Sequence, residues 1–205
     1  LRQLPPDVEG FLHVLIAGNS LPDLFLTDMV VGHGEGLELV ELDLILLVKV
    51  EQLRRDGGEL QPLLDDIRRD EIIWLQSHYS SKRSNFKFEF LDVENAFYSR
   101  DPNQEQASTF QFPFESDAYD FICLTSVFTH MLPGGIENYL QEIARLLKAG
   151  GRCLISYFLM NDSTRHDIRA GTSSRKFAHE VAPACFTDNL KCPEEAVALE
   201  ESYIL

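Results

Sequence analysis

One histidine and one run of glycines are the residues whose types and spacing favour chemistry in this sequence. His130 is the candidate general base, because the ordinary pKa of imidazole, about 6.5, lies close to neutral pH. The alternative for His130, a hydrogen-bonded histidine packed beside Met131, is the one that the sequence favours. Gly32, Gly34 and Gly36 predict a turn in which the backbone needs positive φ, or a loop that passes close to a ligand.

Other kinds of site find no support in the sequence. No group of His, Cys, Asp or Glu has the spacing of metal ligands, so we predict no metal site. No serine stands in a G-x-S-x-G motif, so hydrolase chemistry is not indicated. The four cysteines form no C-x-x-C pair, and Cys123 and Cys153 lie in apolar runs. They predict buried thiols and a reducing, cytoplasmic compartment.

The elements that must position such residues are clearest in the second half of the chain. Residues 119–124 form a short apolar run that predicts a buried parallel strand. Apolar residues at helical spacing follow Gly134-Gly135 and predict a helix that ends at residues 148–151, where a lysine precedes two glycines. Residues 153–159 predict a second buried strand. Together these segments predict a βαβ unit with a right-handed crossover.

A second unit of the same kind is predicted upstream. Residues 70–77 favour a helix, and residues 85–92 alternate apolar with polar side chains, which predicts a strand ending at Asp92. The polar stretch 99–108 predicts a loop. Near the end of the chain, a proline followed by two acids predicts a short final helix over residues 193–203.

The composition is that of a globular protein that avoids phosphate backbones. The 205 residues fit one domain, with 44% hydrophobic and 25% charged residues. The formal net charge of −15 repels nucleic acids, so we expect no broad nucleic-acid-binding surface. No apolar run reaches the roughly 20 residues that cross a bilayer, and no signal peptide is recognised, so no membrane contact is expected.

The segment from Phe112 to Gly151 resembles class I S-adenosylmethionine-dependent methyltransferases. The shared features are Tyr119-Asp120-Phe121 in the predicted strand, the stretch Thr125-Ser126-Val127-Phe128-Thr129-His130-Met131 after it, and the R-L-L-K-A-G-G turn at 145–151. The resemblance covers residues 64–205, whereas residues 1–60 match poorly. It implies a single α/β domain, 1–205, with a Rossmann-like, doubly wound, mostly parallel sheet and helices on both faces.

The resemblance also implies S-adenosyl-L-methionine as the cofactor. Asp66 stands where the family has the acid that ends the second strand and binds the ribose hydroxyls. Asp92 and Val93 stand at the end of the third strand, near the adenine. Thr125 and Ser126 follow the fourth strand and line the cleft for cofactor and substrate, outside the carboxyl ends of the strands. The alternatives are a surface carboxylate for Asp66, a strand-end cap for Asp92 and a helix N-cap for Thr125 and Ser126.

Both ends of the chain depart from the family pattern. The best candidate for the glycine-rich cofactor loop is Gly32, Gly34 and Gly36, which lies further from Asp66 than in the family. The chain stops at Leu205, before the last two strands of the full fold. We therefore expect a sheet that is truncated at its C-terminal end or completed in another way.

The function implied is methyl transfer from S-adenosylmethionine to an unidentified small-molecule acceptor. The alternative is a methyltransferase-like binding or scaffold module without catalysis, which the irregular first sixty residues favour. A nicotinamide-dependent dehydrogenase would need a clean G-x-G-x-x-G after a strand, and the sequence has none. The sequence leaves the oligomeric state open.

Overall fold

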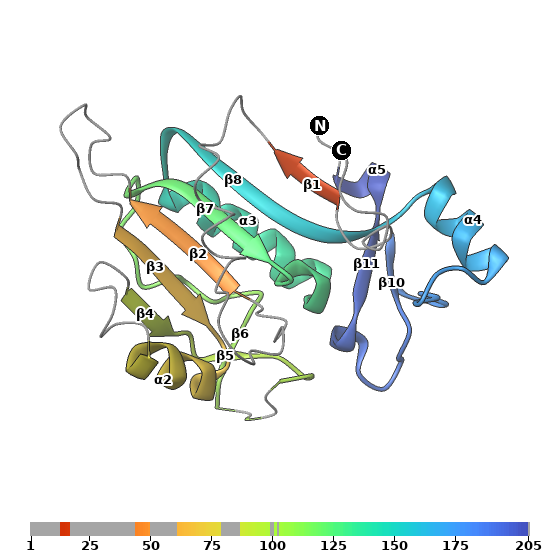
Figure 1. Ribbon diagram of the computed structural model, residues 1–205, viewed down its shortest axis with the longest axis horizontal. Coiled ribbons are helices and arrows are strands. Elements are labelled where there is room, and N and C mark those ends of the chain that lie inside the picture. Colours follow the sequence, from red (N-terminus) through yellow and green to blue (C-terminus); the bar gives the residue numbers. More distant parts are fainter. Residues whose placement is uncertain are drawn as a thin grey trace.

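The computed structural model describes residues 13–16, 44–49, 61–78, 87–98, 101 and 103–204. These residues form a mixed α/β structure built on a nine-stranded sheet with the strand order β4-β3-β2-β7-β8-β11-β10-β9, in which β1 also pairs with β8 (Figure 1). The strands are β1 (His13–Ile16), β2 (Leu44–Lys49), β3 (Gln61–Asp66), β4 (Lys87–Phe90), β7 (Tyr119–Thr125), β8 (Leu147–Met160), β9 (His179–Ala182), β10 (Cys185–Thr187) and β11 (Val197–Glu200).

Six of these strands run in one direction, and five of the six form parallel pairs. β3 is parallel to β4, and β7, β8 and β11 are parallel to one another. β2 lies between β3 and β7 and is antiparallel to both. The pair β3 and β4 therefore has the same direction as β7, β8 and β11. The predicted α/β, Rossmann-like and mostly parallel sheet is therefore confirmed, with β2 as a central exception.

Two helices connect parallel strands in opposite directions along the sheet. Helix α2 (Arg69–His78) links β3 to β4, whereas the 3-10 helix η2 (Phe128–His130) and helix α3 (Pro133–Leu146) lie between β7 and β8. Because such crossovers are right-handed, the two connections place α2 and α3 on opposite faces of the sheet. Figure 1 shows α3 behind the strands. The winding therefore reverses between β3 and β7.

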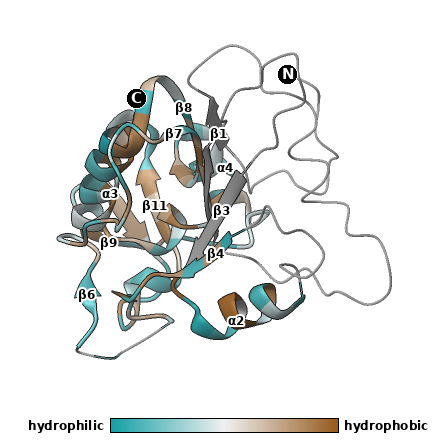
Figure 2. Cartoon of the chain, turned by 90° about the vertical axis from the view of Figure 1, so that its left-hand side faces the viewer, coloured by the Kyte–Doolittle hydropathy of each residue, from teal (hydrophilic) through white to brown (hydrophobic). Residues whose placement is uncertain are grey.

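Helix α3 covers the centre of the sheet with its apolar face. Ile136, Tyr139, Ile143 and Leu146 recur at helical spacing and are buried against Ile122 and Leu124 of β7 and their neighbours. Figure 2 shows the hydrophilic side of α3 turned away from the strands. The strong periodicity of this segment explains why the sequence alone indicated the helix.

The predicted end of this helix was wrong. Helix α3 ends at Leu146, and Leu147 already has extended backbone angles. Residues 148–151 open strand β8, where Gly150 has a φ of +82° that favours glycine. The side chain of Lys148 pairs with Asp120 at 2.7 Å and does not cap the helix.

The predicted final helix over residues 193–203 was also wrong. Its middle, Val197–Glu200, is strand β11, which pairs with β8 on one side and β10 on the other. Only its ends are helical, as the 3-10 helix η3 (Pro193–Glu195) and the short helix α5 (Glu201–Ile204). Burial of the apolar run between two strands overrides the helix signal given by the proline and acids.

The sheet also continues beyond β8, where we expected it to be truncated or completed in another way. Helix α4 (Asp162–Ala170) begins after Asn161, whose side chain accepts a hydrogen bond from the Thr164 N–H, and it ends at Gly171 with a φ of +74°. The following chain supplies β9, β10 and β11. In the stretch predicted to be a loop, residues of β6 (Glu105–Gln106) pair with β5 (Val93–Glu94).

Candidate active site

The acids predicted to bind the cofactor lie at the carboxyl edge of the parallel strands. Asp66 is the last residue of β3 and is in register with Phe90, the last residue of β4. Asp92 follows two residues later, and Thr125 ends β7 at the same edge. In open α/β sheets, ligands bind outside this edge, where the winding reverses.

The carboxylate of Asp92 is exposed and oriented by a neighbouring amide. Its Oδ1 accepts a hydrogen bond of 3.0 Å from Gln104 Nε2, and its main-chain oxygen accepts the Glu105 N–H at 3.2 Å. A carboxylate has about four acceptor sites, so Asp92 can accept further donors. The side chain of Val93 is only 2% exposed in the core, so any contact from Val93 to a cofactor would use its main chain.

The chain turns sharply after β7 at Ser126. Its φ of +58° is uncommon for a residue other than glycine, and two hydroxyl groups stabilise the turn. The Ser126 N–H donates to Ser156 Oγ at 2.7 Å, and the Ser126 carbonyl accepts from Thr129 Oγ1 at 2.7 Å. The N-cap of η2 is Val127, so neither Thr125 nor Ser126 has the N-cap role considered above. Backbone strain of this kind is often found at functional sites.

His130 ends η2 with its ring half-buried between aromatic side chains. The ring stacks on Phe97 with centroids 5.7 Å apart and lies 5.5 Å from the ring of Tyr98. Its Nδ1 is 3.0 Å from the carbonyl oxygen of Glu194, and its own carbonyl accepts from Asn95 Nδ2 at 2.8 Å. The ring is thus hydrogen-bonded, as expected for a histidine with only a structural role. Part of the ring is also exposed to solvent, as a general base requires.

Glu194 is a residue of this cluster that the sequence analysis missed. Its Oε2 accepts the Ala96 N–H at 2.7 Å. Burial raises the pKa of Glu194, and the nearby charge of Glu94 acts in the same direction, against the effects of the Ala96 hydrogen bond and of His130. Nothing in the local sequence around residue 194 indicates a contact with residues so far away. The adjacent aromatic residues 97 and 98 in a polar stretch were the available signal for this cluster.

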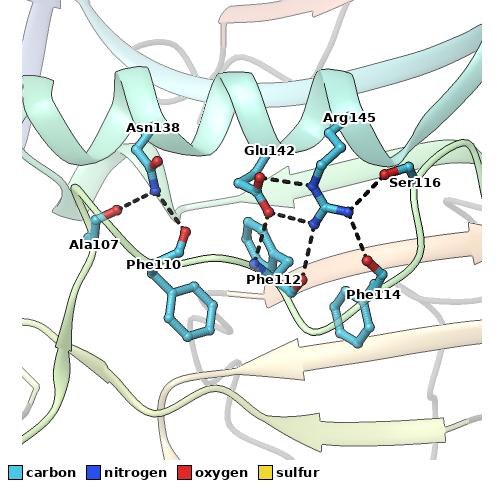
Figure 3. Close-up of polar contacts among 8 residues, drawn as sticks. All are labelled: Ala107, Phe110, Phe112, Phe114, Ser116, Asn138, Glu142 and Arg145. Carbon is cyan, nitrogen blue, oxygen red and sulfur yellow. Dashed lines mark hydrogen bonds and ion pairs between the residues drawn. The ribbon is translucent and has the colours of Figure 1, made fainter.

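A second polar cluster lies at the outer side of α3 and anchors the segment that leads into β7 (Figure 3). Asn138 Nδ2 donates to two main-chain oxygens of this segment, at 2.9 and 2.8 Å, and the carboxylate of Glu142 accepts one main-chain N–H at 2.9 Å. Arg145 pairs with Glu142 at 2.6 Å and donates to three further oxygens of the segment. The groups contacted belong to Ala107, Phe110, Phe112, Phe114 and Ser116.

Three predicted residues of the site, Gly32, Gly34 and Gly36, lie outside the described residues. Within the part of the chain that the structure describes, no group of three or more His, Cys, Asp or Glu is arranged to hold a metal ion. No helix in that part has the length and apolar character of a membrane span.

Comparison with known proteins gives a match for the centre of this region. No solved structure matches the chain significantly. Residues 76–155, which include β4, β7, η2, α3 and most of β8, match the family model of the methyltransferase domain. The resemblance found in the sequence is thereby confirmed over residues 76–155, which are similar to a methyltransferase domain.

Proposed function

We propose that this protein binds S-adenosylmethionine and transfers its methyl group to a small-molecule acceptor. The observation that carries the proposal is the position of Asp66, Asp92 and Thr125 at one carboxyl edge, beside the point where the winding of the sheet reverses. An exposed carboxylate that already accepts one neutral amide, as Asp92 does, suits a ligand that donates hydrogen bonds. These hydrogen-bond acceptors fit the ribose and adenine of the cofactor.

Each residue has a distinct part in the proposal. Asp66 accepts hydrogen bonds from the ribose hydroxyls, and charge-assisted bonds of this kind contribute roughly 1.5–3 kcal/mol. Asp92 and the main chain of Val93 lie beside the adenine, and Thr125 and Ser126 line the space shared with the acceptor. Gly32, Gly34 and Gly36 remain the proposed loop around the methionine part.

The chemistry asks little of the protein beyond alignment. When bound, S-adenosylmethionine supplies a methyl group that its positive sulfur already activates. The protein holds the acceptor in line with it, which accounts for much of the rate. His130 takes a proton from an acceptor whose nucleophilic atom carries one, such as a hydroxyl or an amine.

Charge and cysteine chemistry support the proposed acceptor class and compartment. A net charge of −15 opposes a polynucleotide acceptor and accommodates a small molecule. The four cysteines are free thiols, and burial raises the pKa of Cys123 to about 11 and that of Cys153 to about 12. Unpaired, unreactive thiols support the proposal of a reducing, cytoplasmic compartment.

Isothermal titration of the full chain with S-adenosylmethionine tests the proposal. We expect micromolar binding that Asp66→Ala weakens by at least tenfold and Asp92→Ala weakens by less. Glu115→Ala is the matched control, because this exposed carboxylate precedes β7 at the opposite edge of the sheet. The absence of binding by the wild type, or equal loss in the control, would contradict the proposal.

A binding or scaffold module without catalysis remains the second candidate, and the direction of β2 favours it. The central strand is antiparallel to β3 and β7, so the chain leaves β2 at the edge opposite Asp66. A cofactor loop directly after the central strand would then face away from the site, whereas the proposed loop of Gly32, Gly34 and Gly36 precedes β2 in the sequence. Loss of S-adenosylmethionine binding with an intact fold would support this second candidate.

A further inference from the structure

A contact between two distant segments determines which nitrogen of His130 carries the proton. Nδ1 lies 3.0 Å from the main-chain oxygen of Glu194, 64 positions away in the sequence. A carbonyl oxygen only accepts hydrogen bonds, so Nδ1 must be the donor. In the neutral ring the lone pair is then on Nε2, which becomes the basic nitrogen.

The carbonyl group of Glu194 is held in place by the 3-10 helix η3. The buried hydroxyl of Thr187 donates to the oxygen of Pro193 at 3.0 Å, and the Glu195 N–H donates to the oxygen of Cys192 at 3.0 Å. The main-chain oxygen that meets His130 therefore belongs to a fixed turn rather than to a free loop.

The side chain of Glu194 contacts the surroundings of His130 from a second direction. Its Oε2 accepts the N–H of Ala96 at 2.7 Å. In the same turn, Asn95 Oδ1 accepts the N–H groups of Phe97 and Tyr98, at 3.0 and 3.2 Å. The ring of Phe97 stacks on the imidazole. Glu194 thus makes two contacts. Its main-chain oxygen contacts the imidazole ring, and its carboxylate contacts the turn that carries Phe97, the stacking partner of that ring.

We propose that Glu194 is a positioning residue for His130. Its carbonyl selects the Nδ1–H form of the imidazole, and its carboxylate fixes the turn at Asn95–Tyr98 against the ring. Nε2 is thereby kept as the nitrogen that takes a proton from the acceptor. This inference rests on the proposed function for its catalytic meaning, whereas the selection of the tautomer can be observed without any ligand.

Long-range ¹H–¹⁵N spectra of the full chain, labelled with ¹⁵N-histidine, read the tautomer directly. The measurement is made at about pH 8.5, roughly two units above the ordinary imidazole pKa, and His130→Gln assigns the signal. We expect the Nδ1–H pattern in the wild type. Glu194→Ala keeps the main-chain oxygen but removes the carboxylate that holds the turn at Asn95–Tyr98 against the ring. Without that support, the ring should shift towards the Nε2–H pattern, which histidine prefers in water. Glu194→Gln should keep the wild-type pattern, because its amide oxygen still accepts the Ala96 N–H.

Glu195→Ala is the control, because Glu195 belongs to the same 3-10 helix and its carboxylate accepts from Asn189 Nδ2 at 2.7 Å, away from His130. Its His130 pattern should equal that of the wild type. An Nε2–H pattern in the wild type, an unchanged pattern in Glu194→Ala, or a glutamine variant that behaves like the alanine variant would overturn the proposal.

Circular dichroism establishes that each variant is folded, and the wild-type spectrum decides the tautomer even if Glu194→Ala does not fold. Failure of the proposed function gives a different result. A chain that does not bind S-adenosylmethionine but keeps the Nδ1–H pattern contradicts the methyltransferase proposal and leaves the positioning of His130 by Glu194 intact.

Discussion

Two glutamates in this structure perform the same mechanical task in opposite electrostatic surroundings. Glu142 accepts the Phe112 N–H at 2.9 Å, and Glu194 accepts the Ala96 N–H at 2.7 Å, so each fixes a loop distant in the sequence. The guanidinium of Arg145 lowers the pKa of Glu142. Burial raises the pKa of Glu194, and the charge of Glu94 adds to this effect.

The opposite pKa shifts of Glu142 and Glu194 distinguish a structural anchor on α3 from the proposed functional site at His130. The cluster on α3 balances its charges and satisfies main-chain groups, which is what stabilises a fold. The cluster at His130 keeps a carboxylate where its charge is disfavoured and places it beside an imidazole. Perturbed groups of this kind concentrate at functional sites.

Removal of the balanced anchor should give the largest effect on stability. Glu142→Ala takes away the acceptor of the Phe112 N–H and leaves the partly buried Arg145 without its carboxylate, and hydrogen bonds to charged groups contribute about 1.5–3 kcal/mol. We expect the free energy of unfolding to fall by about 2–3 kcal/mol in urea titrations. The exposed Gln141→Ala on the same helix is the control, and an equal change in both variants would contradict the anchor.

Asn138→Ala tests the uncharged part of the same anchor. Its side-chain amide donates to the main-chain oxygens of Ala107 and Phe110. Two neutral hydrogen bonds of about 0.5–1.5 kcal/mol each predict a loss of about 1–2 kcal/mol, less than for Glu142→Ala. A thermal melt that ranks the two variants in the reverse order would show that the charged pair does not dominate the anchor.

The glutamine variants of the two glutamates should change stability with opposite signs. At neutral pH, Glu142→Gln should destabilise the protein, whereas Glu194→Gln should stabilise it, because it removes a disfavoured charge and keeps the hydrogen-bond acceptor.

The pH dependence of these variants gives the sharper test. The lowered pKa of Glu142 contributes stability above the ordinary glutamate pKa of about 4.3, and this is lost as the pH falls through the lowered value. The raised pKa of Glu194 works in reverse: its contribution is complete below about pH 4.3 and is lost as the pH rises through the raised value. Urea titrations from well below pH 4.3 up to pH 8 cover both losses, because the pKa of Glu142 is lowered and that of Glu194 is raised. The same sign for both variants at neutral pH would remove the contrast.

The smallest effect is expected at an ion pair outside both clusters. Lys148 Nζ lies 2.7 Å from Asp120 Oδ2, but both side chains are about one-third exposed. Lys148→Ala should therefore cost less than about 0.5 kcal/mol, and this cost should vanish in molar salt. The effect of Glu142→Ala should persist in the same salt. Equal salt sensitivity would mean that the anchor on α3 behaves as an ordinary surface pair.

The sequence predicted those parts of the fold that local patterns determine. Strands β7 and β8 and helix α3 were predicted because their apolar residues recur at clear periods. The end of α3 was misplaced because Lys148 and the glycines resemble a helix end, although they open a strand. β11 was missed because only its pairing with β8 and β10 distinguishes this short apolar run from a helix.

The candidate site likewise contains residues that the sequence predicted and a contact that it did not predict. Asp92 was predicted at the end of a strand over residues 85–92, since a strand end is a local feature, whereas Asp66 was placed by the resemblance to the family. The contact between His130 and Glu194 joins residues 64 positions apart through a main-chain oxygen. Every residue type has a main-chain carbonyl group, so no sequence pattern can predict this contact.

The length of β8 affects how often strands β9, β10 and β11 open relative to the rest of the sheet. Its 14 residues pair with β7 in their first part, and only Phe158, Leu159 and Met160 pair with β11. This short ladder joins the hairpins of β9, β10 and β11 to the rest of the sheet. Amide protons of these hairpins should exchange with solvent sooner than those in the centre of β7 and β8. Glu194 belongs to the connection between β10 and β11, so each such opening would also release the ring of His130. The rate of that opening would then limit how long the imidazole keeps one tautomer.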